Sequence, residues 1–153
     1  MAEPPDLVGR ARKYAAAAFA FRDRFPFPHR ASHAAGQFYR ASSSAAVNYC
    51  AAKRGRSKAE FIAKLGQVVE EIDEAVQWLE HLRDVGVEID PALISEAEQL
   101  RRMWGASLGT ARRNERARLQ RLKEDQARRR HGRQLTSHTF PEPTRRPTGS
   151  PDL

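Results

Sequence analysis

The chain has 153 residues, a formal net charge of +8 and a sequence pI near 10.4. Hydrophobic residues make up 40% of it and charged residues 30%, a composition typical of one soluble globular domain. No apolar run reaches the roughly 18 to 20 residues of a membrane-spanning helix, and the single cysteine, Cys50, excludes an intrachain disulfide. We therefore expect a cytoplasmic protein that does not contact a membrane.

The charge is unevenly distributed along the chain. Residues 1–56 contain ten Lys or Arg and three Asp or Glu, residues 57–100 contain three and eleven, and residues 101–153 contain fourteen and five. This basic, acidic, basic order fits two uses of the charge. Neighbouring helices can neutralise one another, or a basic surface can bind a polyanion.

Two helices are predicted in the first third of the chain. Apolar residues spaced three and four apart predict a helix from Leu7 to Phe25, which Pro26 and Pro28 end because proline lacks a backbone donor. A second stripe predicts a helix up to Gly55, and its members are mostly small: Ala31, Ala34, Phe38, Ala41, Ala45, Asn48 and Ala52. Small residues on this face allow another helix to approach closely.

A third and a fourth helix follow. Ser57 and Glu60 form a candidate capping box, so the third helix is predicted to begin near Lys58, and Gly86 marks its end. Asp90 before Pro91 is a typical start for a fourth helix. Its apolar stripe runs from Leu93 to Ala111 and then thins to Leu119 and Leu122 among many arginines.

The domain organisation follows from these elements. Residues 1–131 are predicted to form an all-α, antiparallel up-and-down four-helix bundle with an extended basic fourth helix. Residues 132–153 contain four prolines and few aliphatic residues, so we expect a disordered tail.

The chain contains a pattern of spaced polar residues and helix boundaries that is typical of a known family. The pattern consists of Arg40, Ser43, Ser44, Asn48, Arg56, Ser57, Glu60, Phe61, Leu65, Glu71, Glu74, Trp78, Leu79, Leu82 and Gly86, with EAEQL at Glu96–Leu100 and SLGTAR at Ser107–Arg112. On these residues, the chain resembles the bacterial four-helix-bundle family of 23S ribosomal-RNA intervening-sequence proteins, distantly related to the accessory variability proteins of diversity-generating retroelements. The resemblance implies a ring-shaped homopentamer with a basic surface and no enzymatic activity.

The chain departs from that family in two places. Many relatives carry an Asn-x-x-Glu-Gly motif, whereas Asn48 is followed here by Tyr, Cys, Ala and Ala. A Gly-Ser pair common in the third helix of the family is replaced by Glu70 and Glu71. The role of the missing glutamate therefore cannot be transferred to this chain.

Two sets of cations are candidate nucleic-acid contacts. The first lies at the turn between the second and third helices and consists of Lys53, Arg54, Arg56 and Lys58. The second lies on the fourth helix and consists of Arg112, Arg113, Arg116, Arg118 and Arg121. The structural alternative for the first set is a solvated turn. The alternative for the second set is a fourth helix whose arginines pair with the acidic third helix. No aromatic residue lies among these arginines, which favours phosphate contacts over base stacking.

The remaining polar residues are interpreted as structural. Asn48 is expected to find a partner in Ser44, Glu71 or Glu74, and Ser57 and Glu60 are expected to cap the third helix. Other candidates are weaker, since His29 and His33 have metal-ligand spacing but no third ligand nearby, and Cys50 has no evident catalytic base. We predict no catalytic residue, no metal and no cofactor.

The sequence thus predicts a non-enzymatic, oligomeric protein that binds RNA or DNA through a basic surface. The alternative is a protein-binding scaffold or assembly factor, in which the arginines meet acidic helices of an unknown protein partner.

Overall fold

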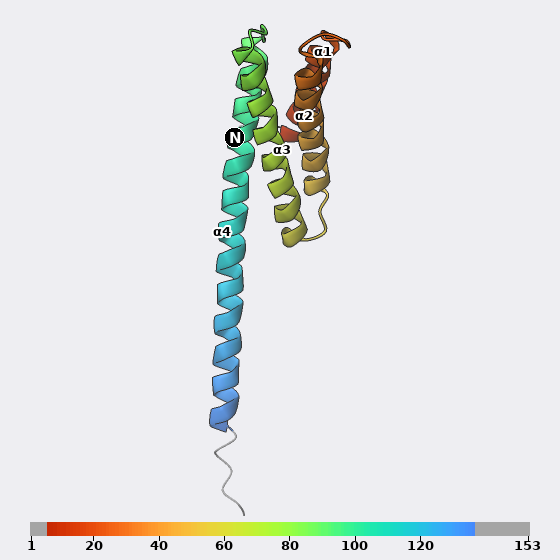
Figure 1. Cartoon of the computed structure of the whole chain (residues 1–153). Coiled ribbons are helices and arrows are strands. Elements are labelled where there is room, and N and C mark those ends of the chain that lie inside the picture. Colours follow the sequence, from red (N-terminus) through yellow and green to blue (C-terminus); the bar gives the residue numbers. More distant parts are fainter. Residues whose placement is uncertain (1–5, 137–153) are drawn as a thin grey trace, which may run out of the picture. The chain divides into compact units, whose positions relative to one another are not determined.

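The computed structural model describes residues 6–136 of the chain, and side chains up to residue 133 (Figure 1). It contains four helices, α1 (Leu7–Asp23), α2 (Ser32–Lys53), α3 (Lys58–Asp84) and α4 (Pro91–Thr136). No strand occurs among residues 6–136. The chain divides into two compact units, residues 1–115 and 116–153. The first unit holds α1, α2, α3 and the first part of α4, which confirms the predicted all-α four-helix fold.

Local side-chain contacts explain where the helices begin. Asp6 Oδ1 accepts a 2.8 Å hydrogen bond from the backbone N–H of Gly9, and Asp90 Oδ1 accepts one of 2.8 Å from that of Ala92. Both carboxylates satisfy backbone donors that have no partner within the helix. At the other end of α3, Gly86 has a φ of 81°, in the left-handed region that favours glycine after a helix.

The predicted capping box at α3 is present in a modified form. Ser57 Oγ accepts a 3.1 Å hydrogen bond from the backbone N–H of Glu60. The carboxylate of Glu60 reaches back to the N–H of Arg56, at 3.0 Å, instead of the N–H of Ser57. The turn before α3 is therefore held by two reciprocal bonds, one residue wider than in the common motif.

Pairwise contacts show the order of the helices around the bundle. The hydroxyls of Tyr14 and Ser42 join α1 to α2, and Arg40 pairs with Glu74 to join α2 to α3. Arg101 lies 3.9 Å from Asp73, which joins α4 to α3. Each helix packs antiparallel against the next helix in the chain, so the topology is up-and-down.

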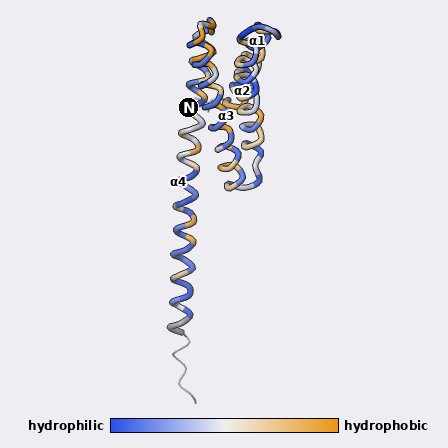
Figure 2. The backbone as a smooth tube through the Cα atoms, viewed as in Figure 1, coloured by the Kyte–Doolittle hydropathy of each residue, from blue (hydrophilic) through white to orange (hydrophobic). Residues whose placement is uncertain are grey.

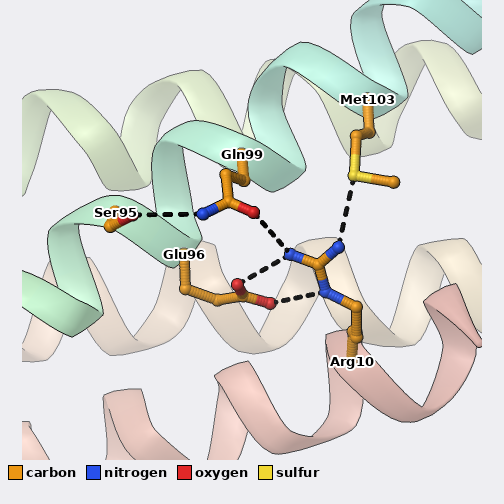
Figure 3. A network of polar contacts seen from close by, with 5 residues as sticks. All are labelled: Arg10, Ser95, Glu96, Gln99 and Met103. Carbon is orange, nitrogen blue, oxygen red and sulfur yellow. Dashed lines mark hydrogen bonds and ion pairs between the residues drawn. The ribbon is translucent and has the colours of Figure 1, made fainter. Parts of the chain in front are cut away.

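The first and the last helix of the bundle, α1 and α4, are joined by a polar network (Figure 3). Arg10 donates two hydrogen bonds to the carboxylate of Glu96, at 3.0 and 2.7 Å. It also donates to Gln99 Oε1 at 3.2 Å and to Met103 Sδ at 3.4 Å. A planar guanidinium can serve all these acceptors at once, so one side chain positions α1 on two turns of α4.

The core combines small and large residues on different helices. The fully buried side chains of α2 include Ala35, Ala41 and Ala45, and those of α3 include Leu65 and Ile72. The largest fully buried side chain of all is Trp104 on α4. The alanine stripe predicted on α2 is thus a buried packing face, which lets the aromatic residues of neighbouring helices fill the space beside it.

The described part of the second unit is the C-terminal part of α4, residues 116–136. Every side chain from 116 to 133 is exposed, and this stretch is largely hydrophilic (Figure 2). The helix includes residues 132–136, which the sequence analysis assigned to the tail, because no proline interrupts the chain before Pro141. The rest of the predicted tail, residues 137–153, lies outside the described residues. Within residues 6–136, no helix combines the length and the apolar character needed to cross a bilayer.

Candidate nucleic-acid interface

The predicted basic turn places four cations within six residues between two helices. Lys53 is the last residue of α2, Arg54 is its C-cap, and Lys58 is the first residue of α3. Arg56 lies between them, and all four side chains are exposed. Gly55 fits this turn closely, since a Cβ added there would lie 3.1 Å from the carbonyl oxygen of Ala52, a tight contact. The tight turn therefore concentrates positive charge at one end of the bundle.

These cations are not neutralised by the bundle itself. No ion pair joins Lys53, Arg54, Arg56 or Lys58 to an acidic residue within the described part of the chain. The carboxylate of Glu60, which is close in sequence, accepts the backbone N–H of Arg56. A hollow of about 350 Å³ runs along the turn, with Lys53, Arg56 and Lys58 in its lining. An anion can therefore approach this turn without displacing an internal partner.

One cation at this end was missed by the sequence analysis. Arg12 of α1 lines a hollow that it shares with Lys53 and Arg54 of α2. It lies 41 positions before Lys53 in the chain, so no local pattern connects the two residues. Only the pairing of α1 with α2 could have revealed it.

The arginines of α4 within the first unit fall into two groups. Arg101 contacts both Asp73 and Glu98, and Arg102 lies 3.9 Å from Glu98. Further along, Arg113 donates to the hydroxyl of Thr110 at 3.1 Å, and Arg112 extends over Gly66 of α3. Neither Arg112 nor Arg113 forms an ion pair with a described acidic residue. Charge matching with the acidic α3 thus involves the start of α4 and not these later arginines.

The second unit carries the other predicted arginines of α4. Arg116, Arg118 and Arg121 are exposed on a helix whose nearest apolar side chains, Leu119 and Leu122, are about half exposed as well. No Phe, Tyr or Trp occurs after Trp104 up to residue 136. This surface offers charge and hydrogen-bond donors, and no Phe, Tyr or Trp ring on which a base could stack.

Of the residues interpreted as structural, Ser57 and Glu60 cap α3, whereas Glu71 and Glu74 of α3 contact α2. Arg40 pairs with Glu74 and lies 3.9 Å from Glu71, and Trp78 Nε1 donates to Glu74 at 3.2 Å. The hydrogen bond from Arg40 lowers the pKa of Glu74 from its ordinary value, with a smaller contribution from Trp78.

The side chain of Asn48 in α2 is half-buried and makes no hydrogen bond to another described residue. Two of its predicted partners, Glu71 and Glu74, pair with Arg40 instead. One oxygen of Glu71 is also buried without a hydrogen-bond partner among the described residues. The contact of this oxygen is the 3.9 Å ion pair with Arg40.

Both histidines of the predicted pair make contacts within the bundle. His29 Nδ1 accepts the backbone N–H of Ala31 at 3.0 Å, whereas the ring of His33 packs edge-on against Trp78. Within residues 6–136, no three His, Cys, Asp or Glu side chains gather as metal ligands would. Cys50 is half-buried on α2. The prediction of a protein without enzymatic activity or cofactor stays a prediction.

The fold is similar to one solved structure whose family is known. It is the crystal structure of a protein of unknown function from the S23 ribosomal protein family of Bacteroides thetaiotaomicron, with a TM-score of 0.61 and 17% sequence identity over 66% of this chain and 96% of that chain. At this identity the similarity shows the fold alone. No protein-family model matches the sequence, and no curated protein matches it.

Proposed function

We propose that this protein is a non-enzymatic, cytoplasmic, oligomeric four-helix-bundle protein that binds nucleic acid through its basic surface. The observation that carries the proposal is that neither the arginines at Arg112 and Arg113 of α4 nor the turn cluster Lys53, Arg54, Arg56 and Lys58 form an ion pair with a described acidic residue. The similarity to a member of an S23 ribosomal protein family, and the resemblance to intervening-sequence proteins, support the same assignment.

The chemistry favours the phosphate backbone as the ligand. Arginine presents a planar fork of donors that matches a phosphate, and exposed cations release bound counterions when they meet a polyanion. No Phe, Tyr or Trp lies among the arginines of α4 from Arg112 up to residue 136. We therefore expect weak sequence selectivity and strong salt dependence.

The scaffold alternative makes a different use of the same charges. Arg101 and Arg102 pair with acidic residues of the bundle, and a neighbouring protein with an acidic helix could engage Arg112 and Arg113 in the same way. Binding to nucleic acid would then be absent at physiological salt. Retention on an acidic protein partner would replace it.

Four substitutions on α4 test the proposed function. Replacing Arg112, Arg113, Arg116 and Arg118 by Gln should weaken binding to structured RNA and duplex DNA, because each lost phosphate contact reduces the slope of log affinity against log salt by about one. Fluorescence anisotropy over a range of salt concentrations measures both the affinity and this slope. Helicity should stay near wild type, since Gln is a good helix former.

A control variant removes the same charge elsewhere. Lys13, Arg22, Arg24 and Arg83 are exposed and belong to neither predicted basic set. Their replacement by Gln should leave the salt slope close to that of the wild type. Equal slopes in the wild type and in the α4 variant would contradict the proposal and favour the scaffold.

The proposed oligomer is a homopentamer, as the family resemblance implies. Light scattering coupled to size exclusion should give about 87 kDa, five times the 17.3 kDa chain. A concentration-independent mass of 17.3 kDa would contradict oligomerisation.

A further inference from the structure

A basic groove lies between the N-terminal part of α1 and the end of α2. It has a volume of about 420 Å³ and is lined by Val8 and Arg12 of α1 and by Cys50, Lys53 and Arg54 of α2. Val8 and Arg12 are four residues apart, as are Cys50 and Arg54, so each pair lies on one face of its helix. Each of the two helices thus contributes to the groove one apolar side chain and at least one cationic side chain.

The groove has an unbalanced charge. Its three charged side chains, those of Arg12, Lys53 and Arg54, are all cations, and none of them is ion-paired with a described residue. Asp6 is the acidic residue at the start of α1, and its carboxylate accepts the backbone N–H of Gly9. Three like charges around one hollow repel one another, and an anion bound between them would remove this repulsion.

Arg54 is held in position for such a ligand. Its Nε donates to the carbonyl oxygen of Cys50, one turn earlier in α2, at 3.3 Å. This bond directs the guanidinium back along the helix toward the groove and leaves both terminal nitrogens without a partner among the described residues. A guanidinium ordered in this way loses less side-chain entropy when it binds an anion.

We propose that this groove binds a phosphoryl group, with Arg12 and Arg54 as hydrogen-bond donors and Lys53 as a compact positive charge. The volume falls within the range of about 300 to 1,000 Å³ that is typical of ligand sites. Val8 and Cys50 provide an apolar wall for the sugar or base attached to the phosphate. Where the phosphate belongs to a polynucleotide, the inference rests on the proposed function and names one fixed contact point within it.

A pair of neighbouring cations provides a matched test. Arg12 lines the basic groove, whereas Lys13, the next residue, lines a different hollow that also contains Asp90 and Glu96. Both side chains are exposed, and each substitution by Gln removes one positive charge from α1. Arg12→Gln should weaken binding of the full chain to a fluorescent single-stranded RNA about 5- to 10-fold and reduce the salt slope by about one. Lys13→Gln should change neither quantity appreciably.

A second variant tests geometry instead of charge. Arg54→Lys keeps the positive charge and removes the planar fork, so it should lower affinity while leaving the salt slope nearly unchanged. Equal effects of Arg12→Gln and Lys13→Gln would overturn the site, because binding would then respond to total charge alone. Circular dichroism of each variant shows that the comparison is made between folded proteins.

Titration with ADP and with inorganic pyrophosphate distinguishes the source of the phosphate. Binding of RNA that depends on Arg12, with no heat of binding for ADP or pyrophosphate, assigns the groove to a polynucleotide backbone. Binding of ADP or pyrophosphate that Arg12→Gln abolishes, in a protein that does not bind RNA or DNA, keeps the groove and overturns the proposed function. A wild-type protein that binds none of these probes overturns both.

Discussion

Replacement of Trp104 by alanine should lower the free energy of unfolding by about 3–5 kcal/mol, the cost typical of removing a large buried aromatic residue. Trp104 is the largest fully buried side chain in the described structure, and its ring lies 5.2 Å from that of Tyr49, centroid to centroid. Truncation would remove contacts to its surroundings and leave a cavity that the helices can only partly close. Urea unfolding followed by circular dichroism measures the loss.

A more conservative variant serves as the control for this prediction. The indole N–H of Trp104 is buried without a hydrogen-bond partner among the described residues. Trp104→Phe keeps an aromatic ring and deletes this unsatisfied donor, so its loss should be clearly smaller than that of Trp104→Ala. A loss below about 1 kcal/mol for the alanine variant would show that Trp104 is not a core residue in solution.

The second large effect is expected at the buried pair of hydroxyls between α1 and α2. Tyr14 and Ser42 lie 3.0 Å apart, oxygen to oxygen, and both side chains are almost completely buried. Ser42→Ala should cost about 1–3 kcal/mol, because it leaves the phenol hydroxyl buried without its partner. Tyr14→Phe should cost less, since the hydroxyl of Ser42 can turn to a backbone carbonyl of its own helix.

The double variant Tyr14→Phe/Ser42→Ala separates the hydrogen bond from the burial of its two groups. It removes both polar groups together, so it should be more stable than Ser42→Ala alone. Denaturant unfolding of the four proteins completes the cycle. A double variant less stable than Ser42→Ala would contradict the assignment of this pair as a mutually satisfied contact.

The same pair predicts how stability changes at high pH. Burial raises the pKa of Tyr14 well above its ordinary value of 10.0, although the hydrogen bond with Ser42 partly offsets this. In the unfolded chain the phenol loses its proton above about pH 10, whereas the folded protein keeps it. This contribution to stability is therefore fully present below pH 10 and is lost as the pH rises further. Tyr14→Phe should show a shallower decline in that range.

The sequence alone determined the helices and their ends, because those features depend on residues close together in the chain. Pro26 and Pro28 end the first helical stripe, Ser57 and Asp90 satisfy the first donors of α3 and α4, and Gly86 has the positive φ that follows α3. Apolar spacing then predicted which face of each helix is buried. These limits follow from such local chemistry, so the sequence is enough to find them. The end of α4 has no such signal before Pro141, and it was predicted too early.

Contacts between helices were decided only by the tertiary structure. Which arginine of α4 meets an acidic side chain depends on the rotation of α4 against α3, and so Arg101 is paired while Arg112 is not. The carboxylates of Glu71 and Glu74, which the sequence suggested as partners of Asn48, pair with Arg40 in the structure. The basic groove likewise exists because α1 packs against α2 and brings Arg12 beside Lys53. Charge and apolar spacing can be obtained from the sequence itself. The distance between side chains on two helices depends on how those helices pack.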